Sequence, residues 1–142
     1  MSQNNNDIFM QCLRPITLTA KSSPDGIGRV VPCGKCFACL STRRAQWSVR
    51  LAKELDSSTS SYFVTLTYDD LHCPVSVDKR HCQLFMKRLR FRSEPFKLRY
   101  FLVSEYGTKS GRPHYHMLLF NFPQDYDISR ALAYAWPHGF FS

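Results

Sequence analysis

The sequence predicts an α+β protein in which an antiparallel sheet carries helices on one face. Runs rich in β-branched and aromatic residues favour four strands, at 62–68, 97–105, 114–121 and 140–142. Apolar residues recur at helical spacing in two further segments, 78–92 and 127–136. The elements therefore follow the order β-α-β-β-α-β, which is that of the split βαβ or ferredoxin-like arrangement. Such a unit packs its helices on one face of the sheet and leaves the other face free.

The sequence ahead of this sheet has a different character. We expect three parts: a polar, disordered N-terminus (1–11), a cysteine-rich arm with a basic helix (12–60) and the sheet-bearing core (61–142). The basic helix is predicted over 41–56, where Ser41 or Thr42 can cap its first turn. An apolar residue then recurs at every fourth position along one face: Trp47, Leu51 and Leu55.

Turn and cap signals bound the elements of the core. The segment “DDLHCPVS” ends the first strand, and a loop with two glycines, “YGTKSGRP”, joins the second and third strands into a hairpin. Asp127 is the expected cap of the last helix, and Pro137 and Gly139 end it. The fourth strand has barely begun when the sequence stops.

Length and charge narrow the range of functions. Lys and Arg number 19 against 11 Asp and Glu, and the net charge of +8 favours a polyanion such as nucleic acid as partner. A membrane surface or solubility alone would also fit this charge. No apolar run approaches the ~20 residues of a membrane span, and the N-terminus has no secretory signal. We therefore expect a cytoplasmic protein without a membrane partner, whose six cysteines are thiols or metal ligands rather than disulfides.

The segment “GRPHYHMLLF” (111–120) places His114 and His116 one residue apart at the start of a strand. Alternate residues of a strand point to the same face, so both imidazoles can bind one cation. Glu105 ends the preceding strand of the hairpin and therefore lies beside them. One carboxylate and two imidazoles with open positions predict a catalytic metal site for Mg²⁺ or Mn²⁺. The alternative is a set of solvated polar residues at strand ends.

Three segments carry a resemblance to the HUH endonuclease superfamily, the tyrosine nucleases that initiate rolling-circle replication: “FVTLTY” (63–68), “VSEYG” (103–107) and “RPHYHMLLF” (112–120). In that family, a histidine–hydrophobic–histidine strand carries two metal ligands. A third ligand, often acidic, lies on the adjacent strand. The resemblance places His114, His116 and Glu105 in these three roles.

Further segments narrow the resemblance to replication initiators of microvirus single-stranded-DNA bacteriophages, particularly the gokushovirus branch: “VPCGKCFACLSTRRAQW” (31–47), “FMKRLR” (85–90) and “WPHGF” (136–140). The resemblance implies a metal-dependent nick in single-stranded DNA at the phage origin. A tyrosine attacks the phosphate, and the product is a 5′-phosphotyrosine link with a free 3′-OH. It also implies action in the cytoplasm of the bacterial host, with the host replication machinery as a possible partner.

The nucleophilic tyrosine of that family lies on a helix after the fourth strand, in a Y-x-x-K-like motif. The sequence stops before such a helix could form, so we expect the nucleophile beyond residue 142 and a truncated C-terminal end. Tyr134 precedes the fourth strand and has the wrong context. The chain alone is then expected to bind the ion and DNA but to cleave poorly or not at all.

Four cysteines near the N-terminus have the spacing of a metal site: Cys12, Cys33, Cys36 and Cys39. Four thiolates joined by a glycine-bearing loop suit a closed tetrahedral Zn²⁺ site with a structural role. An iron–sulfur cluster and free thiols are the alternatives. The bacterial ferredoxin pattern needs a cysteine where this chain has Arg43, which favours zinc.

Basic residues that could follow a phosphate backbone are concentrated in the second predicted helix and before the paired histidines: Lys87, Arg88, Arg90 and Arg112. The alternative function is a non-catalytic, zinc-containing module that binds single-stranded nucleic acid. Such a module would show exposed aromatic residues on the free face of its sheet. A remnant that competes for origin DNA without nicking it is a third reading.

Overall fold

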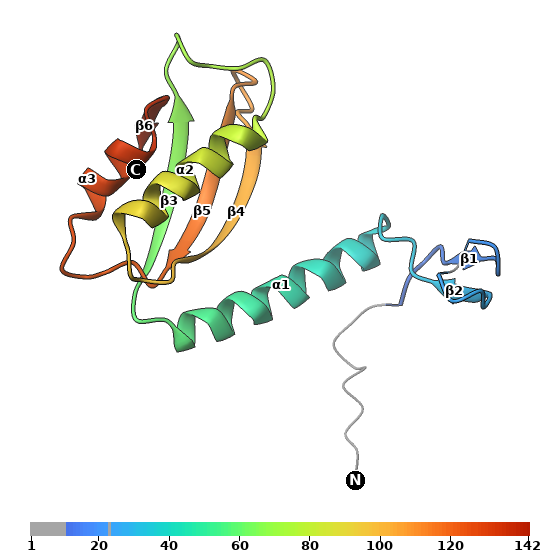
Figure 1. Ribbon diagram of the computed structural model, residues 1–142. Helices are drawn as coiled ribbons and strands as arrows, with labels where there is room; N and C mark the ends of the chain where they lie inside the picture. Colours follow the sequence, from blue (N-terminus) through green and yellow to red (C-terminus); the bar gives the residue numbers. More distant parts are fainter. Residues whose placement is uncertain (1–10, 23) are drawn as a thin grey trace. The chain divides into compact units, whose positions relative to one another are not determined.

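The structure is a computed structural model that describes residues 11–22 and 24–142 (Figure 1). Nearly all of the N-terminal segment predicted to be disordered lies outside the described residues. The chain divides into two compact units, Met1–Lys53 and Glu54–Ser142. The predicted mixture of helices with antiparallel sheet is confirmed.

The first unit contains a short hairpin followed by a long helix. Strands β1 (Ile16–Leu18) and β2 (Arg29–Val31) pair antiparallel, and helix α1 spans Phe37–Ser57. The hairpin was not predicted. Helix α1 begins four residues before the predicted start at residue 41, so the prediction of Ser41 or Thr42 as its cap was wrong.

The early start of α1 has a local cause in the “CGKC” loop. Gly34 adopts a left-handed conformation (φ 73°), which glycine reaches without steric cost, and this turns the chain sharply. The amide of Leu40 can then donate to the carbonyl of Cys36 at 3.0 Å, and the helix follows directly. Among the described residues of this unit, Ala38 is the only buried hydrophobic residue.

The second unit is built on a four-stranded sheet in the order β4-β5-β3-β6. Its strands are β3 (Ser61–Tyr68), β4 (Arg99–Tyr106), β5 (Pro113–Phe120) and β6 (Gly139–Phe141). Every neighbouring pair is antiparallel. The predicted strands agree with these bounds to within one or two residues.

Two helices of this unit begin at aspartate caps. Helix α2 spans Lys79–Arg92, and the carboxylate of Asp78 accepts from two amides of its first turn. Helix α3 spans Ile128–Ala135, and Asp127 accepts from the amide of Arg130 at 3.2 Å, as its sequence position predicted. Each cap satisfies donors that the first helical turn leaves without partners.

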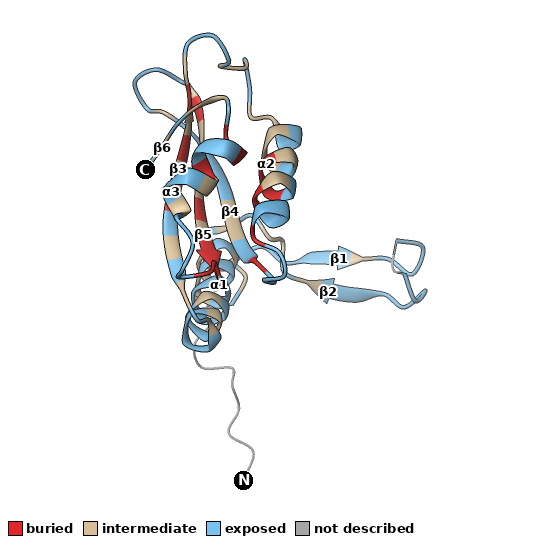
Figure 2. Cartoon of the chain, turned by 60° about the vertical axis from the view of Figure 1, so that its left-hand side comes forward, coloured by how far each residue is buried: buried red, intermediate tan, exposed pale blue. Residues whose placement is uncertain are grey.

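The core lies between these helices and one face of the sheet. Alternate residues of β3 and β5 are buried there, together with residues of α2 and α3: Val64, Leu66, Tyr68, Tyr115, Met117, Leu119, Phe85, Met86, Leu89, Leu132 and Ala135. Figure 2 shows these buried segments on β3, β5 and α2. The intervening residues of the strands point to the opposite face, which we call the open face.

Among the described residues, none of the helices combines the length and apolar character that a membrane crossing needs.

Candidate metal centre

The β4–β5 hairpin brings the three predicted ligands together on the open face. Glu105 lies directly across from His114 in the register, and His116 follows two residues later on the same strand. A tight loop closes this hairpin, in which Gly107 donates to the carbonyl of Arg112 at 2.9 Å. Strand alternation and hairpin register therefore place all three side chains on one side of the sheet.

The ligand atoms of this group, which we call the Glu–His–His group, lie near a common point. Oε2 of Glu105 is 3.7 Å from Nε2 of His114 and 3.4 Å from Nε2 of His116. All three atoms lie within 4.8 Å of one another. Neighbouring ligands of an octahedral Mg²⁺ or Mn²⁺ are about 3 Å apart, and rotation of the exposed Glu105 side chain can close the difference. Three ligands leave positions for water and a phosphate oxygen.

Outer contacts orient both imidazoles. Nδ1 of His114 can donate to the carbonyl of Arg112 at 3.4 Å, and Nδ1 of His116 lies 3.2 Å from Oγ1 of Thr65. With Nδ1 engaged as a donor, the lone pair of each ring is on Nε2, which faces the common point. The ring of Phe63 stacks on His116, with centroids 5.6 Å apart and planes 20° from parallel.

Thr65 and Phe63 are functional candidates that the sequence reasoning missed. Both belong to β3, which lies about 50 residues before His116 in the chain and beside it in the sheet. The threonine-rich strand was recognised as part of the family pattern, but its register against β5 is a tertiary feature. Alternation on β3 alone would have shown that Phe63 and Thr65 share a face.

Arg112 lies immediately before β5, where its guanidinium is already engaged. It donates to the carbonyl of Tyr68 at 3.0 Å and forms an ion pair with Asp70. The neighbouring carboxylate raises the pKa of Arg112. A cavity of about 180 Å³ lies between this residue, Gly107 and His114. Arg112 therefore borders the metal group, as the sequence suggested, and also ties the β3 end to the hairpin.

The predicted basic residues of α2 lie on the helical side of the sheet. Arg88 donates to the carbonyl of Ala135 at 3.3 Å, so it also supports the end of α3. The guanidinium of Arg90 lies 5.5 Å from the centre of the Tyr100 ring. Lys87 is exposed. Since α2 packs on the face opposite the Glu–His–His group, these three residues and the group do not share one surface.

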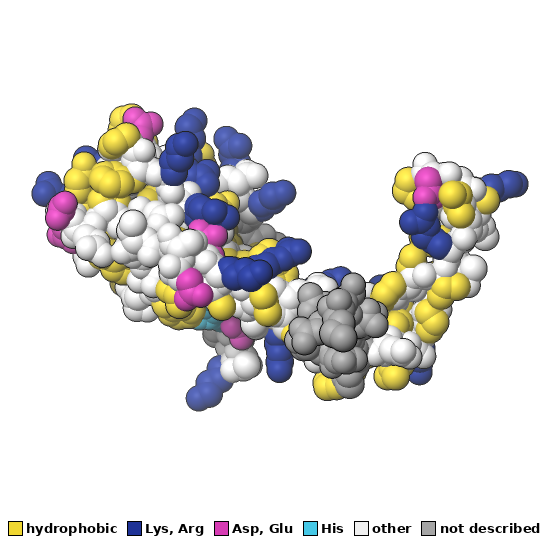
Figure 3. All heavy atoms as spheres, turned by 90° about the horizontal axis from the view of Figure 1, so that it is seen from below, with side chains coloured by type: hydrophobic (Ala, Val, Ile, Leu, Met, Phe, Trp, Pro, Cys, Tyr) yellow, Lys and Arg dark blue, Asp and Glu magenta, His cyan; other side chains and the backbone are white. Residues whose placement is uncertain are grey.

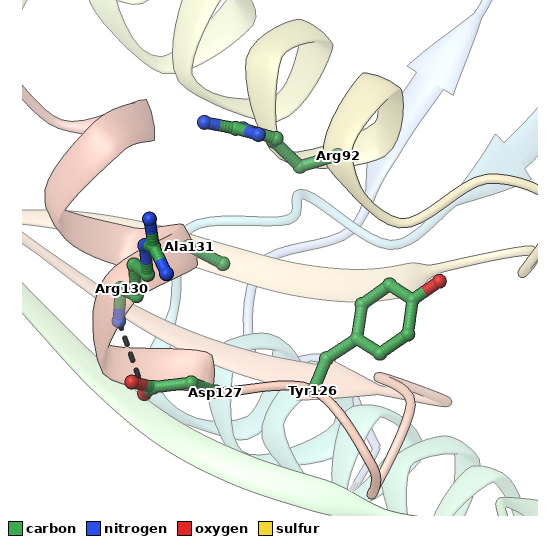
Figure 4. A pocket seen from close by; sticks show the side chains of 5 residues that line it. All are labelled: Arg92, Tyr126, Asp127, Arg130 and Ala131. Atoms are coloured by element: carbon green, nitrogen blue, oxygen red, sulfur yellow. Dashed lines mark hydrogen bonds between the residues drawn. The ribbon is translucent and has the colours of Figure 1, made fainter.

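A separate hollow of about 350 Å³ lies between the end of α2 and the start of α3, lined by Arg92, Tyr126, Asp127, Arg130 and Ala131 (Figure 4). The figure shows both guanidiniums directed into the space between the helices. The carboxylate of Asp127 also lines this hollow and opposes an anion there. The hollow shares no residue with the Glu–His–His group.

The tyrosines of the second unit are placed away from the metal group. Tyr68 and Tyr115 are buried with hydroxyls 3.0 Å apart, and burial raises the pKa of both. Tyr106 is followed by lysine three residues later, so the Y-x-x-K spacing does occur, but in the hairpin loop. Its hydroxyl accepts from the amide of Val77 at 3.2 Å, on the helical side. Tyr134 contacts the Arg92 guanidinium, 4.3 Å from its ring centre.

The four cysteines of the first unit form a compact cluster. Sγ of Cys12 is 3.9 Å from Sγ of Cys36, and Sγ of Cys33 is 3.9 Å from Sγ of Cys39. A Zn–S bond of about 2.3 Å in a tetrahedron separates its sulfurs by about 3.8 Å, so the spacing suits zinc. All four sulfurs lie within 4.8 Å of one another. This donor set could hold a metal ion.

Backbone amides point at these sulfurs. The amides of Cys36 and Lys35 donate to Sγ of Cys33 at 3.4 and 3.5 Å. Amides of Cys39 and Leu13 lower the pKa of Cys36 to about 6. Burial raises the pKa of Cys39 to about 12, so that thiol needs a nearby cation to ionise at neutral pH.

With both sites described, comparison with known proteins identifies the class. Residues 61–142, more than half of the chain, match the sequence model of a family of replication-associated proteins, described by its member ORF2. The chain belongs to this family. The matched range covers the whole open-faced sheet and its Glu–His–His group.

Three curated relatives come from bacterial viruses, and they confirm the resemblance to microvirus replication proteins. The chain is 40% identical to replication-associated protein ORF2 of Spiroplasma virus 4 over 112 residues, which is 72% of this chain and 35% of that protein. It is 32% identical to replication-associated protein ORF4 of Chlamydia phage 1 over 122 residues, 79% of this chain and 31% of that protein.

The third relative is replication-associated protein VP4 of Bdellovibrio phage phiMH2K, 31% identical over 137 residues, 82% of this chain and 43% of that protein. The chain therefore spans between a third and somewhat over two fifths of the length of these relatives. No solved structure matches the chain significantly.

Proposed function

We propose that the second unit is the metal-binding part of an HUH-type replication initiator, which nicks single-stranded DNA and transfers the strand. The observation that carries the proposal is the convergence of Glu105, His114 and His116 on one point of the open face. The family supports a role in replication. The strand order β4-β5-β3-β6 with antiparallel pairing supports the ferredoxin-like arrangement in which this chemistry is expected.

In this proposal the chain's own residues hold and orient the reacting phosphate. Glu105 and the two imidazoles would bind Mg²⁺ or Mn²⁺, which polarises the scissile phosphate and stabilises charge in the transition state. A tyrosine oxygen attacks phosphorus, the bond to the 3′ oxygen breaks, and the 3′ oxygen leaves as a hydroxyl after gaining a proton. Since none of the described tyrosines of this unit points to the group, we assign the nucleophile to the protein beyond residue 142.

The remaining roles follow from the same proposal. The cysteine cluster would hold Zn²⁺ as a structural ion, because its four thiolates leave no open position. Single-stranded DNA at a phage origin is the partner, in the cytoplasm of a bacterial host, and the host replication machinery is a further candidate. Lys87, Arg88, Arg90 and Arg112 are candidate phosphate contacts, and Arg112 is the nearest of them to the metal group.

Manganese binding tests the proposal. With Zn²⁺ supplied to fill the cysteine cluster, titration calorimetry should find one further Mn²⁺ site in the 142-residue chain. Glu105→Ala or His114→Ala should weaken binding at that site by more than about 100-fold, because each removes a direct ligand. Far-ultraviolet circular dichroism should stay unchanged, because both side chains lie outside the core.

His72→Ala is the matched control. His72 pairs with Asp69 at 2.7 Å in the loop after β3, so its loss should leave Mn²⁺ affinity unchanged. Equal affinity in the parent, Glu105→Ala and His114→Ala would refute the ligand assignment.

A non-catalytic binding module is the second candidate function, and exposed aromatic residues on the open face favour it. Phe63 and Phe140 are 65% and 67% exposed there. Both functions predict binding of single-stranded DNA, but only the nuclease needs a cation at the Glu–His–His group. A chain that binds DNA and shows no specific Mn²⁺ site would therefore favour the binding module.

A further inference from the structure

An apolar row crosses the open face next to the metal group. Leu118 of β5 lies opposite Phe63 on one side and Phe101 of β4 on the other. The next row across the sheet contains Thr65, His116 and Val103. The apolar row and the metal-ligand rows are therefore adjacent layers of one surface.

Phe63 is the exposed member of this row. Its side chain is 65% exposed, whereas Phe101 and Leu118 are half-buried. One face of its ring covers the imidazole of His116, and the sheet holds its backbone through pairing with β5. Figure 3 shows histidine atoms beside hydrophobic and acidic side chains on the face seen from below. A large flat ring that a rigid strand holds in water is a ready surface for another flat ring.

The position of the ring limits what could cover it. Nε2 of His116 faces the metal point, and the ring of the same residue contacts Phe63. A ligand whose phosphate occupies the open metal positions must therefore extend over or past Phe63. In single-stranded DNA each phosphate is joined through a sugar to a base, and bases stack on exposed aromatic side chains irrespective of sequence. The chain's net charge of +8 also favours a polyanion.

We propose that Phe63 is a stacking platform for the nucleobase next to the phosphate held at the Glu–His–His group. This inference rests on the proposed function and adds a positioning residue to it. The stacked base fixes the register of the strand on the sheet, so that one particular phosphate reaches the metal point. Thr65 and Thr67, the next residues of β3 on the same face, are too small to offer such a platform.

The test measures DNA binding and metal binding in the same variants of the 142-residue chain. Affinity for a fluorescein-labelled oligo(dT) in the presence of Mn²⁺ should fall about tenfold or more in Phe63→Ala, because one base loses its stacking partner. Phe63→Trp should retain affinity, and its added indole fluorescence should be quenched by the oligonucleotide.

Phe91→Ala is the matched control. Phe91 is 70% exposed on α2, which packs on the opposite face of the sheet, so its removal should leave DNA affinity unchanged. Mn²⁺ affinity without DNA should be equal in the parent and in Phe63→Ala.

Each other outcome overturns the inference in a recognisable way. Equal DNA affinity of Phe63→Ala and the parent, with a normal Mn²⁺ site, would refute the platform and leave the proposed function standing. Parallel loss of Mn²⁺ and DNA affinity would make Phe63 a support of His116 rather than a platform. Absence of the Mn²⁺ site in the parent would refute the proposed function itself.

Discussion

At the scale of single residues, β3 supports the metal group without supplying a ligand. Oγ1 of Thr65 lies 3.2 Å from Nδ1 of His116, and this contact selects the tautomer whose Nε2 can bind a cation. Hydrogen bonds of this kind orient the ring before the ion arrives. Thr65 should therefore affect metal affinity although it does not touch the ion.

We expect Thr65→Val to weaken Mn²⁺ binding about tenfold, because the isosteric side chain leaves Nδ1 of His116 without this partner. Thr65→Ser should retain affinity, since the hydroxyl is kept. Calorimetric titration of both variants measures the effect. Thr67→Val is the control, because Oγ1 of Thr67 donates to the carbonyl of Phe140 at 3.3 Å instead. Similar losses in Thr65→Val and Thr67→Val would contradict a specific role of Thr65.

The three ligands could be predicted from sequence because their geometry is local. His114 and His116 share a face by alternation, and a short glycine-containing loop brings Glu105 beside them. Thr65 and Phe63 could not be predicted in the same way. Their proximity to His116 depends on the pairing of strands that lie far apart in the sequence.

At the scale of elements, strand β6 depends on a glycine at its first position. A Cβ added to Gly139 would lie closer than 3.0 Å to backbone atoms of Thr67, Tyr68 and Asp69. The same approach allows the amide of Asp69 to donate to the carbonyl of His138 at 3.0 Å. The glycine of the “WPHGF” segment therefore permits close contact between β6 and the end of β3.

We expect Gly139→Ala to destabilise the second unit by about 1–3 kcal/mol or more, because backbone atoms must move to admit the methyl group. The thermal midpoint should fall by roughly 10 °C. Gly111→Ala provides the comparison, since a Cβ there meets no atom within 4 Å. Its left-handed φ of 64° should cost only about 1–2 kcal/mol. Equal midpoints for Gly139→Ala and the parent would show that β6 pairing tolerates a side chain.

The strands and caps of the second unit could be predicted because their signals are local. Alternation marks β5, and Asp127 precedes the apolar spacing of α3. The start of α1 could not, because the loop of the cysteine cluster rather than a capping residue determines it. The β1–β2 hairpin has only three residues in each strand, too few for a periodic pattern.

At the scale of the whole molecule, the two units are stabilised in different ways. The second unit encloses an apolar core that includes Trp136, Phe85 and Phe122. The described part of the first unit buries a single hydrophobic residue, Ala38, and gathers four cysteines instead. Small segments that cannot bury enough apolar surface usually depend on a metal or on crosslinks.

We expect metal removal to unfold one unit and spare the other. A zinc chelator should abolish the hydrogen-exchange protection of amides 33–40, because ligand binding supplies the folding free energy there. Amides of β3 and β5 should remain protected, since their stability derives from the core. Mass-spectrometric hydrogen exchange measures both regions at once. Unchanged protection in both regions after complete removal of zinc would contradict this division.

Strand β5 is hydrogen-bonded to a neighbour along each of its edges, β3 on one side and β4 on the other. The imidazole pair therefore sits on the most constrained strand of the sheet, and only Glu105 lies near the hairpin bend. A cation or phosphate that docks there meets histidines that are already ordered, so little conformational entropy is lost on binding. The connecting bend can consequently vary in length or composition among homologues while the spacing of the two rings stays the same.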